Sequence, residues 1–565
     1  MKKSRFFALV LALVMLVSVL AGCGPKTNHD AEGNTPAASP TQETQMKSVQ
    51  GTIEGEAATG MVDKIVVQSG SSSENPSPFA PSVGGMAKSL LYAKLIARNC
   101  YGALLDNCTM WLAKSVTKVD DFTYDIELYD YIHDSKGNNI DADDVVFSYQ
   151  MSYKEGKFNR IGTSMESIEK TGDYTLRMKL LTNAPGTVED LMSNPQLDIV
   201  DKDWYENATE EERRKDPATT GPYRIVSEVP GSSFVFEAVE DYWQKDTSLL
   251  PKNGLQNVKT IEFKVITENA MGVIALENHE VDFARFNDAT SLKRFFVDGK
   301  PVDGYNVDLG DGVFTMDMFL NMSENSILST SLELRKAVLY ALNSVDIMYA
   351  LGNDENTSFA LTTLGAPAMA GAQPQWETED YYDYNPEKAA EFLKEAGYKP
   401  GEVTLTFMSN STLTNDSARA VIVNNLEEAG FNVELLTVDS ALFNVYQRDN
   451  TQWDLSIQFK SAGTGHITGC WDICFNPGSF PDGTSVCFNH DDHLIELLEA
   501  AKNDPTPENM NAFHYYLKDQ AYCKGLYSTR SASVSTDKIL EIATDALSNP
   551  LPNAMVFAAD YESGK

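Results

Sequence analysis

A strand-helix-strand pattern in the second half of the chain most constrains the fold. Residues 403–408 form a short apolar run, residues 417–429 have helical apolar spacing and end at Gly430, and residues 431–438 form a second apolar run. Two strands joined by a helix of this length are parallel, and their crossover is right-handed. The pattern therefore predicts an α/β architecture for this region.

A second unit lies between Asp120 and Tyr149. Residues 122–132 alternate apolar and polar side chains, which is typical of a half-buried strand. Residues 134–139 are turn formers, and the acidic residues that follow Ile140 open an apolar-periodic helix. Residues 167–181 repeat the strand alternation, which predicts a second strand in the same subdomain.

The N-terminus has the pattern of a secretory signal. Lys2, Lys3 and Arg5 precede an uncharged apolar run over residues 6–20, which is too short to span a membrane. The run ends in Leu-Ala-Gly-Cys, typical of a bacterial lipoprotein whose Cys23 is lipidated. A plain signal peptide with an incidental cysteine is the alternative. We expect a signal over 1–22, a flexible tether over 23–60, and a lipid anchor on the extracytoplasmic face of the cell membrane.

The length and the net charge of the chain limit its domain organisation and its possible partners. The chain has 565 residues and a formal net charge of −36, so it is long enough for two large lobes or several smaller domains. Binding nucleic acid requires basic clusters that neutralise phosphates. The sequence lacks such clusters, and we expect no nucleic-acid partner.

Six cysteines besides Cys23 bear on the redox state of an extracellular protein. Clustering favours a disulfide between Cys100 and Cys108 and one within the C-terminal four, although other pairings stay open. The candidates are Cys100, Cys108, Cys470, Cys474, Cys487 and Cys523. A zinc site at the C-terminal cysteines is disfavoured because the paired CxxC spacing of structural zinc sites is missing.

The region around Asp120–Tyr149 also resembles a known family. The matching residues are Asp121, Thr123, Tyr124, His133, Asp134, Ala142, Asp143, Asp144, Val145 and Phe147. They are similar to a signature of family 5 of the extracellular solute-binding proteins, the peptide, oligopeptide and nickel-binding subunits of ABC importers. The glycine that this family has directly after His133-Asp134 is displaced to Gly137. Residues 221–223, 239–243, 330–343 and 385–398 also resemble family motifs, in the family's order.

The resemblance implies a fold and a division into domains. It predicts a two-lobe α/β protein of the periplasmic-binding-protein type (type II, with an extra subdomain) and a hinge between the lobes. The expected parts are lobe I over 61–103, 221–306 and 525–565, its extra subdomain over 104–220, and lobe II over 307–524.

The resemblance also implies a function and a set of ligand contacts. It predicts a monomeric, non-catalytic protein without cofactors that binds an oligopeptide between its lobes and delivers it to ABC permease and ATPase subunits. Asp472 would pair with the α-ammonium group of the ligand, because a buried ammonium needs a carboxylate; a helix- or turn-capping role for Asp472 is equally open. Further predicted contacts are Phe79, Tyr101, Phe459, Trp471 and Tyr527.

Other functions have weaker support in the sequence. His490 and His493, with His466, could bind nickel or zinc, but acidic residues beside them at a helix start favour a capping role, so no resident metal is expected. A metal-chelate or oligosaccharide cargo is the alternative within the transport class. A surface receptor or chaperone-like protein without transport is the alternative outside it. Motifs of nucleophilic, phosphate-binding or zinc enzymes are missing from the sequence.

Overall fold

The computed structural model describes residues 48–70, 76–80, 86–156, 158–286, 288–461, 463–479 and 483–564. The chain from residue 46 onward forms one compact unit. The predicted signal peptide, Cys23 and the first part of the predicted tether lie outside the described residues. Among the helices of the described ranges, none combines the length and the hydrophobicity that a membrane crossing requires.

Lobe I is built on a seven-stranded sheet in the order β14-β21-β11-β1-β10-β9-β8. The central strand β1 is parallel to β10 and β11, whereas the outer pairs are antiparallel. The strands are β1 (Val62–Ser69), β8 (Tyr223–Val229), β9 (Ser233–Ala238), β10 (Val258–Val265), β11 (Phe283–Phe286), β14 (Tyr305–Leu309) and β21 (Ala532–Thr536). Buried apolar residues of β1, β9 and β10 form its core.

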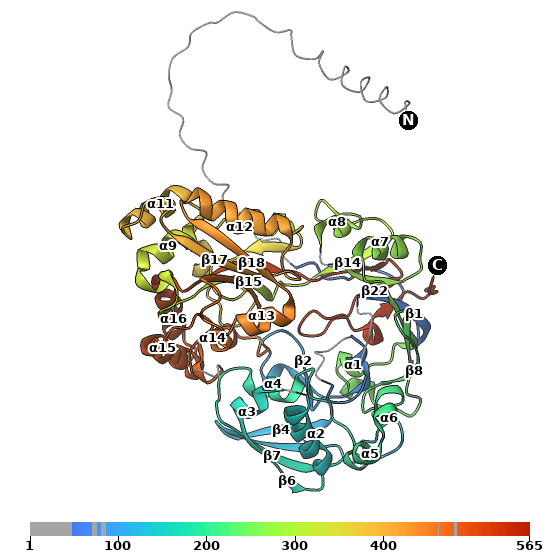
Figure 1. Cartoon of the computed structure of the whole chain (residues 1–565). Coiled ribbons are helices and arrows are strands. Elements are labelled where there is room, and N and C mark those ends of the chain that lie inside the picture. The colour runs from blue at the N-terminus through green and yellow to red at the C-terminus, as the bar shows by residue number, and fades with distance from the viewer. Residues whose placement is uncertain are drawn as a thin grey trace, which may run out of the picture. The chain divides into compact units, whose positions relative to one another are not determined.

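Lobe II has a six-stranded sheet in the order β16-β20-β15-β19-β17-β18. The predicted strand-helix-strand unit is confirmed as β17, α12 (Asp416–Glu428) and β18, with β17 and β18 parallel. The strands are β15 (Phe314–Leu320), β16 (Ser358–Ala360), β17 (Thr404–Asn410), β18 (Asn432–Val438), β19 (Leu455–Lys460) and β20 (Cys523–Thr529). Helices α9 (Leu332–Ala341) and α11 (Pro386–Glu395) pack against each other beside this sheet (Figure 1).

The extra subdomain carries a four-stranded antiparallel sheet in the order β4-β5-β7-β6. Its strands are β4 (Ala113–Asp120), β5 (Thr123–Leu128), β6 (Met165–Gly172) and β7 (Thr175–Leu180). Helix α2 (Ala142–Lys154) follows the predicted turn and begins with a capping box between Asp141 and Asp144. In that turn the Asp134 carboxylate accepts the backbone N–H groups of Lys136 and Asn138.

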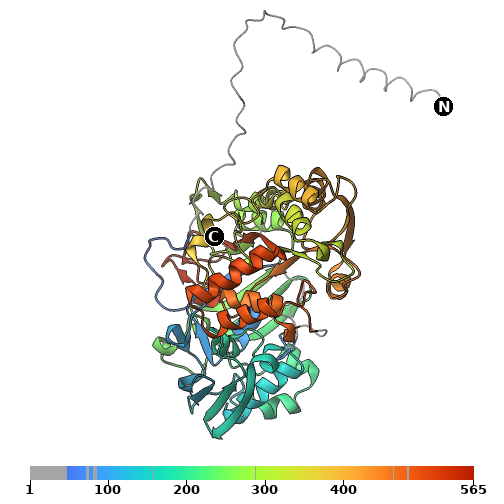
Figure 2. The same ribbon diagram turned by 90° about the vertical axis from the view of Figure 1, so that its left-hand side faces the viewer.

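The remaining elements are short or lie around these three sheets. Helices α15 (Asp492–Asn503) and α16 (Pro507–Gln520) pack side by side, and Figure 2 shows them in orange-red. The other helices are α1 (Met86–Leu91), α3 (Arg160–Ser164), α4 (Thr187–Ser193), α5 (Lys202–Asn207), α6 (Glu210–Lys215), α7 (Asn269–Glu277), α8 (Ala289–Leu292), α10 (Ser344–Ala350), α13 (Ser440–Tyr446) and α14 (Ile467–Phe475). The short strands are β2 (Ile96–Arg98), β3 (Cys108–Met110), β12 (Phe296–Val297), β13 (Lys300–Pro301), β22 (Ile539–Glu541) and β23 (Val556–Phe557).

The chain passes between the two large sheets at two places. β14 of lobe I leads to β15 of lobe II through residues 310–313, and β20 leads back to β21 through residues 530–531. The two segments are bonded to each other, because Gly310 N–H donates to Ser531 O at 3.0 Å. From this sheet membership we propose lobe boundaries at these segments, a few residues beyond the predicted 306/307 and 524/525.

The segment over residues 48–58 departs from the predicted flexible tether. It makes isolated β-bridges from Val49 to Leu309, from Thr52 to Glu541 and from Ala57 to Ala558. Asn306 Nδ2 also donates to Gly51 O at 2.9 Å. Strand β14 is at the edge of its sheet, and an edge strand presents backbone groups that a neighbouring segment can pair with. The prediction is therefore corrected for residues 48–58, whose polar composition gave no sign of this docking.

Candidate ligand-binding site

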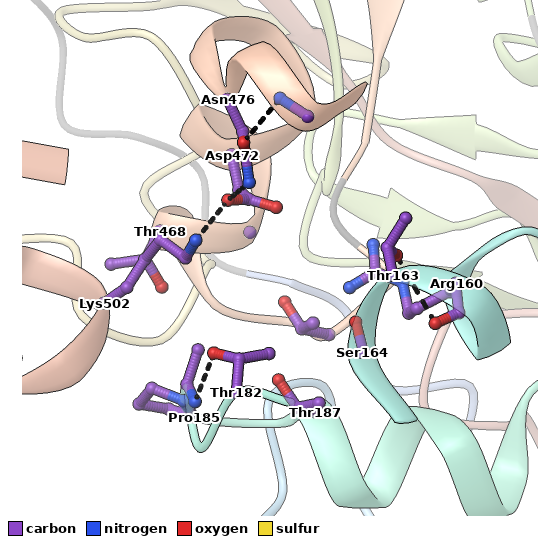
Figure 3. A pocket seen from close by; sticks show the side chains of 14 residues that line it. Arg160, Thr163, Ser164, Thr182, Pro185, Thr187, Thr468, Asp472, Asn476 and Lys502 are labelled. Carbon is purple, nitrogen blue, oxygen red and sulfur yellow. Dashed lines mark hydrogen bonds and ion pairs between the residues drawn. The ribbon is translucent and has the colours of Figure 1, made fainter. Parts of the chain in front are cut away.

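A cavity of about 340 Å³ lies between the extra subdomain and the helices that follow β19 in lobe II (Figure 3). Its lining combines two cationic side chains, one carboxylate and many hydroxyl groups. The lining residues are Arg160, Thr163, Ser164, Thr182, Ala184, Pro185 and Thr187 from the extra subdomain, and Thr464, Thr468, Gly469, Asp472, Asn476, Gly478 and Lys502 from lobe II. A ligand here would touch both lobes.

Helix α14 positions the lobe II wall of the cavity. Its buried face holds Trp471, which is fully buried, donates its indole N–H to Leu364 O at 2.8 Å and stacks on Phe513. The next residue along the helix, Asp472, is turned by the helical step of about 100° toward the cavity. Gly469 lets the Thr464 side chain pack directly on the helix, because a Cβ at that position would overlap the Thr464 hydroxyl.

Asp472 is already engaged within the protein. Its Oδ1 forms an ion pair with Lys502 Nζ at 2.6 Å and accepts a hydrogen bond from Asn476 Nδ2 at 2.9 Å. Lys502 also donates to Glu499 at 2.8 Å. Burial opposes the charged form of Lys502, but Asp472 and Glu499 outweigh this effect and raise the pKa of Lys502. Lys502 is therefore a charged ammonium at the edge of the cavity.

Arg160 forms the corresponding ion pair on the extra subdomain. Its Nε lies 3.0 Å from Oδ2 of Asp190, whose side chain is fully buried. Asp190 Oδ1 accepts a hydrogen bond from Asn194 Nδ2 at 2.9 Å. This arrangement fixes Arg160 through Nε, while its guanidinium lines the cavity beside Thr163 and Ser164 (Figure 3).

A contact between the lobes adjoins the cavity and depends on glycines. Arg98 Nη1 donates to Gly463 O at 2.6 Å. Gly186, at φ +78°, faces residue Thr464 so closely that a Cβ would lie 2.5 Å from the Thr464 carbonyl oxygen. A Cβ on Gly102 would lie 2.9 Å from Gly465 O. We call Gly102, Gly186 and Gly465 the glycine contact; their missing side chains allow the two backbones to meet.

The predicted aromatic contacts do not line this cavity. Tyr527 is buried in β20, and Phe79 is buried edge-on against Tyr205. Phe459 is exposed and stacks on Phe314 with ring centroids 5.4 Å apart. Tyr101, from lobe I, packs against the lobe II core cluster that contains Trp471. Of the six predicted ligand contacts, the structure thus brings only Asp472 to this cavity, and the roles of all six stay predictions.

The predicted disulfide candidates carry free thiols in this structure. Cys100 Sγ accepts a bond from Asn107, and Cys108 donates its S–H to Leu104 O, instead of bonding to each other. Burial raises the pKa of Cys108 to about 12. The four others are buried in the core under α14, α15 and α16: Cys470, Cys474, Cys487 and Cys523. Within the described ranges, no three His, Cys, Asp or Glu side chains converge in a geometry that could hold a metal ion, and this includes His466, His490 and His493.

Comparison with known proteins identifies the family. Residues 107–472 match the model of the bacterial extracellular solute-binding proteins, family 5 (middle). The chain belongs to this family. The oligopeptide-binding protein AppA of Bacillus subtilis is 22% identical over 423 residues, which are 70% of this chain and 73% of AppA.

Solved structures show the same two-lobe fold. AppA from Clostridium difficile has a TM-score of 0.72 and 17% identity, covering 88% of this chain and all of that one. NikA from Brucella suis, solved in complex with Fe(III)-EDTA, has a TM-score of 0.67 and 19% identity, covering 88% of this chain and all of that one. The predicted family and fold are thereby confirmed.

Sequence reasoning missed Arg160 and Lys502 in this family 5 protein. Lys502 is in the last turn of an amphipathic helix, where a basic residue is ordinarily explained by the helix dipole. Arg160 begins the five-residue helix α3, which has no clear periodic pattern. Only the approach of the two lobes identifies them as cavity residues.

Proposed function

We propose that this protein is the substrate-binding subunit of an ABC importer, that it holds an oligopeptide between its two lobes, and that it delivers this cargo to a membrane permease. The observation that carries the proposal is the cavity whose walls come from both lobes. A ligand that contacts both walls favours the closed form of the protein. A permease can then distinguish loaded from empty protein, because the loaded protein is closed and the empty protein is open. Peptide as the cargo is supported by the name of the relative AppA.

The proposal includes a location and a partner set. We infer that the chain is secreted and anchored through a lipid on Cys23, and that it acts as a monomer without catalysis. The lipoprotein pattern at Leu20–Cys23 supports the anchor. The ATPase and permease subunits would be separate chains.

Native mass spectrometry of the protein from residue 46 onward tests the cargo. The protein is purified without added ligand, and denaturation then releases any bound compound for sequencing. Peptides that co-purify, and that synthetic copies replace, support the proposal. A protein that ignores a random peptide library and retains a different compound overturns the peptide assignment while leaving the transport role.

A metal chelate or an oligosaccharide is the second candidate cargo. The hydroxyl-rich lining of the cavity, with side chains such as Thr163, Thr182 and Thr468, suits a polar compound of this kind. The NikA complex with Fe(III)-EDTA has the same fold. The same mass spectrometric experiment identifies such a cargo directly.

A further inference from the structure

The two cations of the cavity are held in similar ways on opposite lobes. Arg160 is held by Asp190 on the extra subdomain, and Lys502 is held by Asp472 and Glu499 on lobe II. Each cation thus has a protein carboxylate behind it and also lines the same cavity (Figure 3). These pairs keep both side chains in place before a ligand arrives, which lowers the entropic cost of binding.

Both cations keep hydrogen-bond donors for a ligand. An ammonium has three N–H donors, and Lys502 uses two of them on Asp472 and Glu499. A guanidinium has five N–H donors, and Arg160 faces Asp190 through an ion pair in which Nε lies 3.0 Å from Oδ2. The remaining donors belong to groups that line the cavity, so each wall offers N–H groups of a cation.

The negative charge of Asp472, the carboxylate that lines the cavity, is in contrast already compensated within the protein. Asp472 Oδ1 receives both Lys502 and Asn476, and the ion pair offsets its negative charge. A second ammonium placed against Asp472 would be repelled by Lys502 nearby. A ligand ammonium therefore gains little from this site, although Asp472 is the residue to which the family resemblance assigns that role.

We propose that this cavity holds a ligand carboxylate between Arg160 and Lys502, one cation from each lobe, and that binding needs no free amino group. This inference rests on the proposed binding function and deepens it: Lys502 takes the place of a ligand ammonium on Asp472. The carboxylate is either the C-terminus of a peptide or that of a free polyhydroxy acid. Because one carboxylate bonds to both lobes, it also stabilises the closed form.

Isothermal titration with matched probes tests the carboxylate. The probes are tri-alanine, N-acetyl-tri-alanine and tri-alanine amide, followed by gluconate and the neutral gluconamide. N-acetylation is expected to change affinity by less than about threefold, and C-terminal amidation to lower it by about tenfold or more, the size expected for a lost bond between charged groups. The inverse pattern, in which acetylation abolishes binding and amidation is tolerated, overturns the inference.

The same titrations test the peptide cargo and the carboxylate site separately. Gluconate that binds in preference to gluconamide, while all three peptides fail, supports the carboxylate site and contradicts the peptide cargo. If neither tri-alanine nor gluconate binds at millimolar concentration, the carboxylate site itself is refuted.

Variants assign the effect to the two cations. Lys502→Gln and Arg160→Gln should each remove most of the tenfold preference for the acid over its amide. Lys518→Gln is the matched control, because Lys518 pairs with Glu379 at 3.6 Å and does not line the cavity. If Lys502→Gln does not fold, the double variant Lys502→Gln with Asp472→Asn removes both charges of the ion pair, so that no uncompensated carboxylate remains at position 472. An unchanged preference for the acid in these cavity variants contradicts the assignment.

Discussion

Replacing Gly186 by alanine should weaken ligand binding by preventing close approach of the lobes. The new Cβ would lie 2.5 Å from the Thr464 carbonyl oxygen, closer than real Cβ contacts come. Both groups are close to their own backbones, so neither can rotate away, and one lobe must retreat. Overpacking of this kind costs about 1–3 kcal/mol, which corresponds to a loss of about 5- to 150-fold in affinity if only the closed form suffers.

A second cost of Gly186→Ala is independent of closure. Gly186 has φ +78°, and a left-handed conformation costs an alanine about 1 kcal/mol in any state of the lobes. Gly137→Ala is the matched control, because Gly137 has φ +86° in the same subdomain and nothing lies within 4 Å of its added Cβ. The control should lose stability without losing affinity.

Titration calorimetry with the co-purified cargo and small-angle scattering measure the two effects. Gly186→Ala should bind at least about fivefold more weakly than Gly137→Ala and should scatter as a more open particle at equal ligand concentration. Equal affinities of the two variants would refute the reasoning that the glycine contact is specific to the closed form.

Three further predictions concern buried groups. Burial raises the pKa of Asp317 to about 7, so the wild type loses stability as pH rises from about 4 to about 7, by at most on the order of 4 kcal/mol over the whole range. Asp317→Asn should remove this loss. The free energy of unfolding in urea, measured at pH 5 and at pH 8, checks this for both proteins. Lys524 Nζ donates to the carbonyl oxygens of Leu339, Leu342 and Tyr382, so Lys524→Met should cost about 3 kcal/mol or more, and a melting temperature equal to wild type would contradict this. The six thiols should all titrate with a thiol reagent after denaturation, whereas only the exposed Cys100 should react rapidly in the native protein; fewer than six would reveal a disulfide.

Local patterns predicted the elements well, because their causes are local. The unit β17-α12-β18 follows from apolar spacing and from Gly430, which the structure places at φ +102° just after the helix. The turn at Asp134 likewise depends on residues within four positions of it. The predicted strand at residues 122–132 ends earlier, at Leu128, because alternation alone does not show where pairing stops.

The site was predictable only in part. Asp472 was found through family resemblance, and the structure places it in the cavity. Its partner Lys502 is 30 residues away in the sequence, and Arg160 lies in another lobe. Such pairings arise from tertiary approach, which neither periodicity nor composition records. The buried positions of Trp471 and Tyr527 could not be distinguished from ligand contacts, because aromatic residues serve both purposes.

The docking of residues 48–58 has a mechanical consequence. This segment is bonded to β14 and to the C-terminal region beyond β21, all on the lobe I side of the crossing segments. Under the proposed anchoring through Cys23, a pull from the membrane would be transmitted to lobe I alone. Lobe II would then move relative to lobe I during closure, and lobe I, which receives the pull, would not need to move. A force applied at residue 48 would therefore leave the equilibrium between the open and closed forms unchanged.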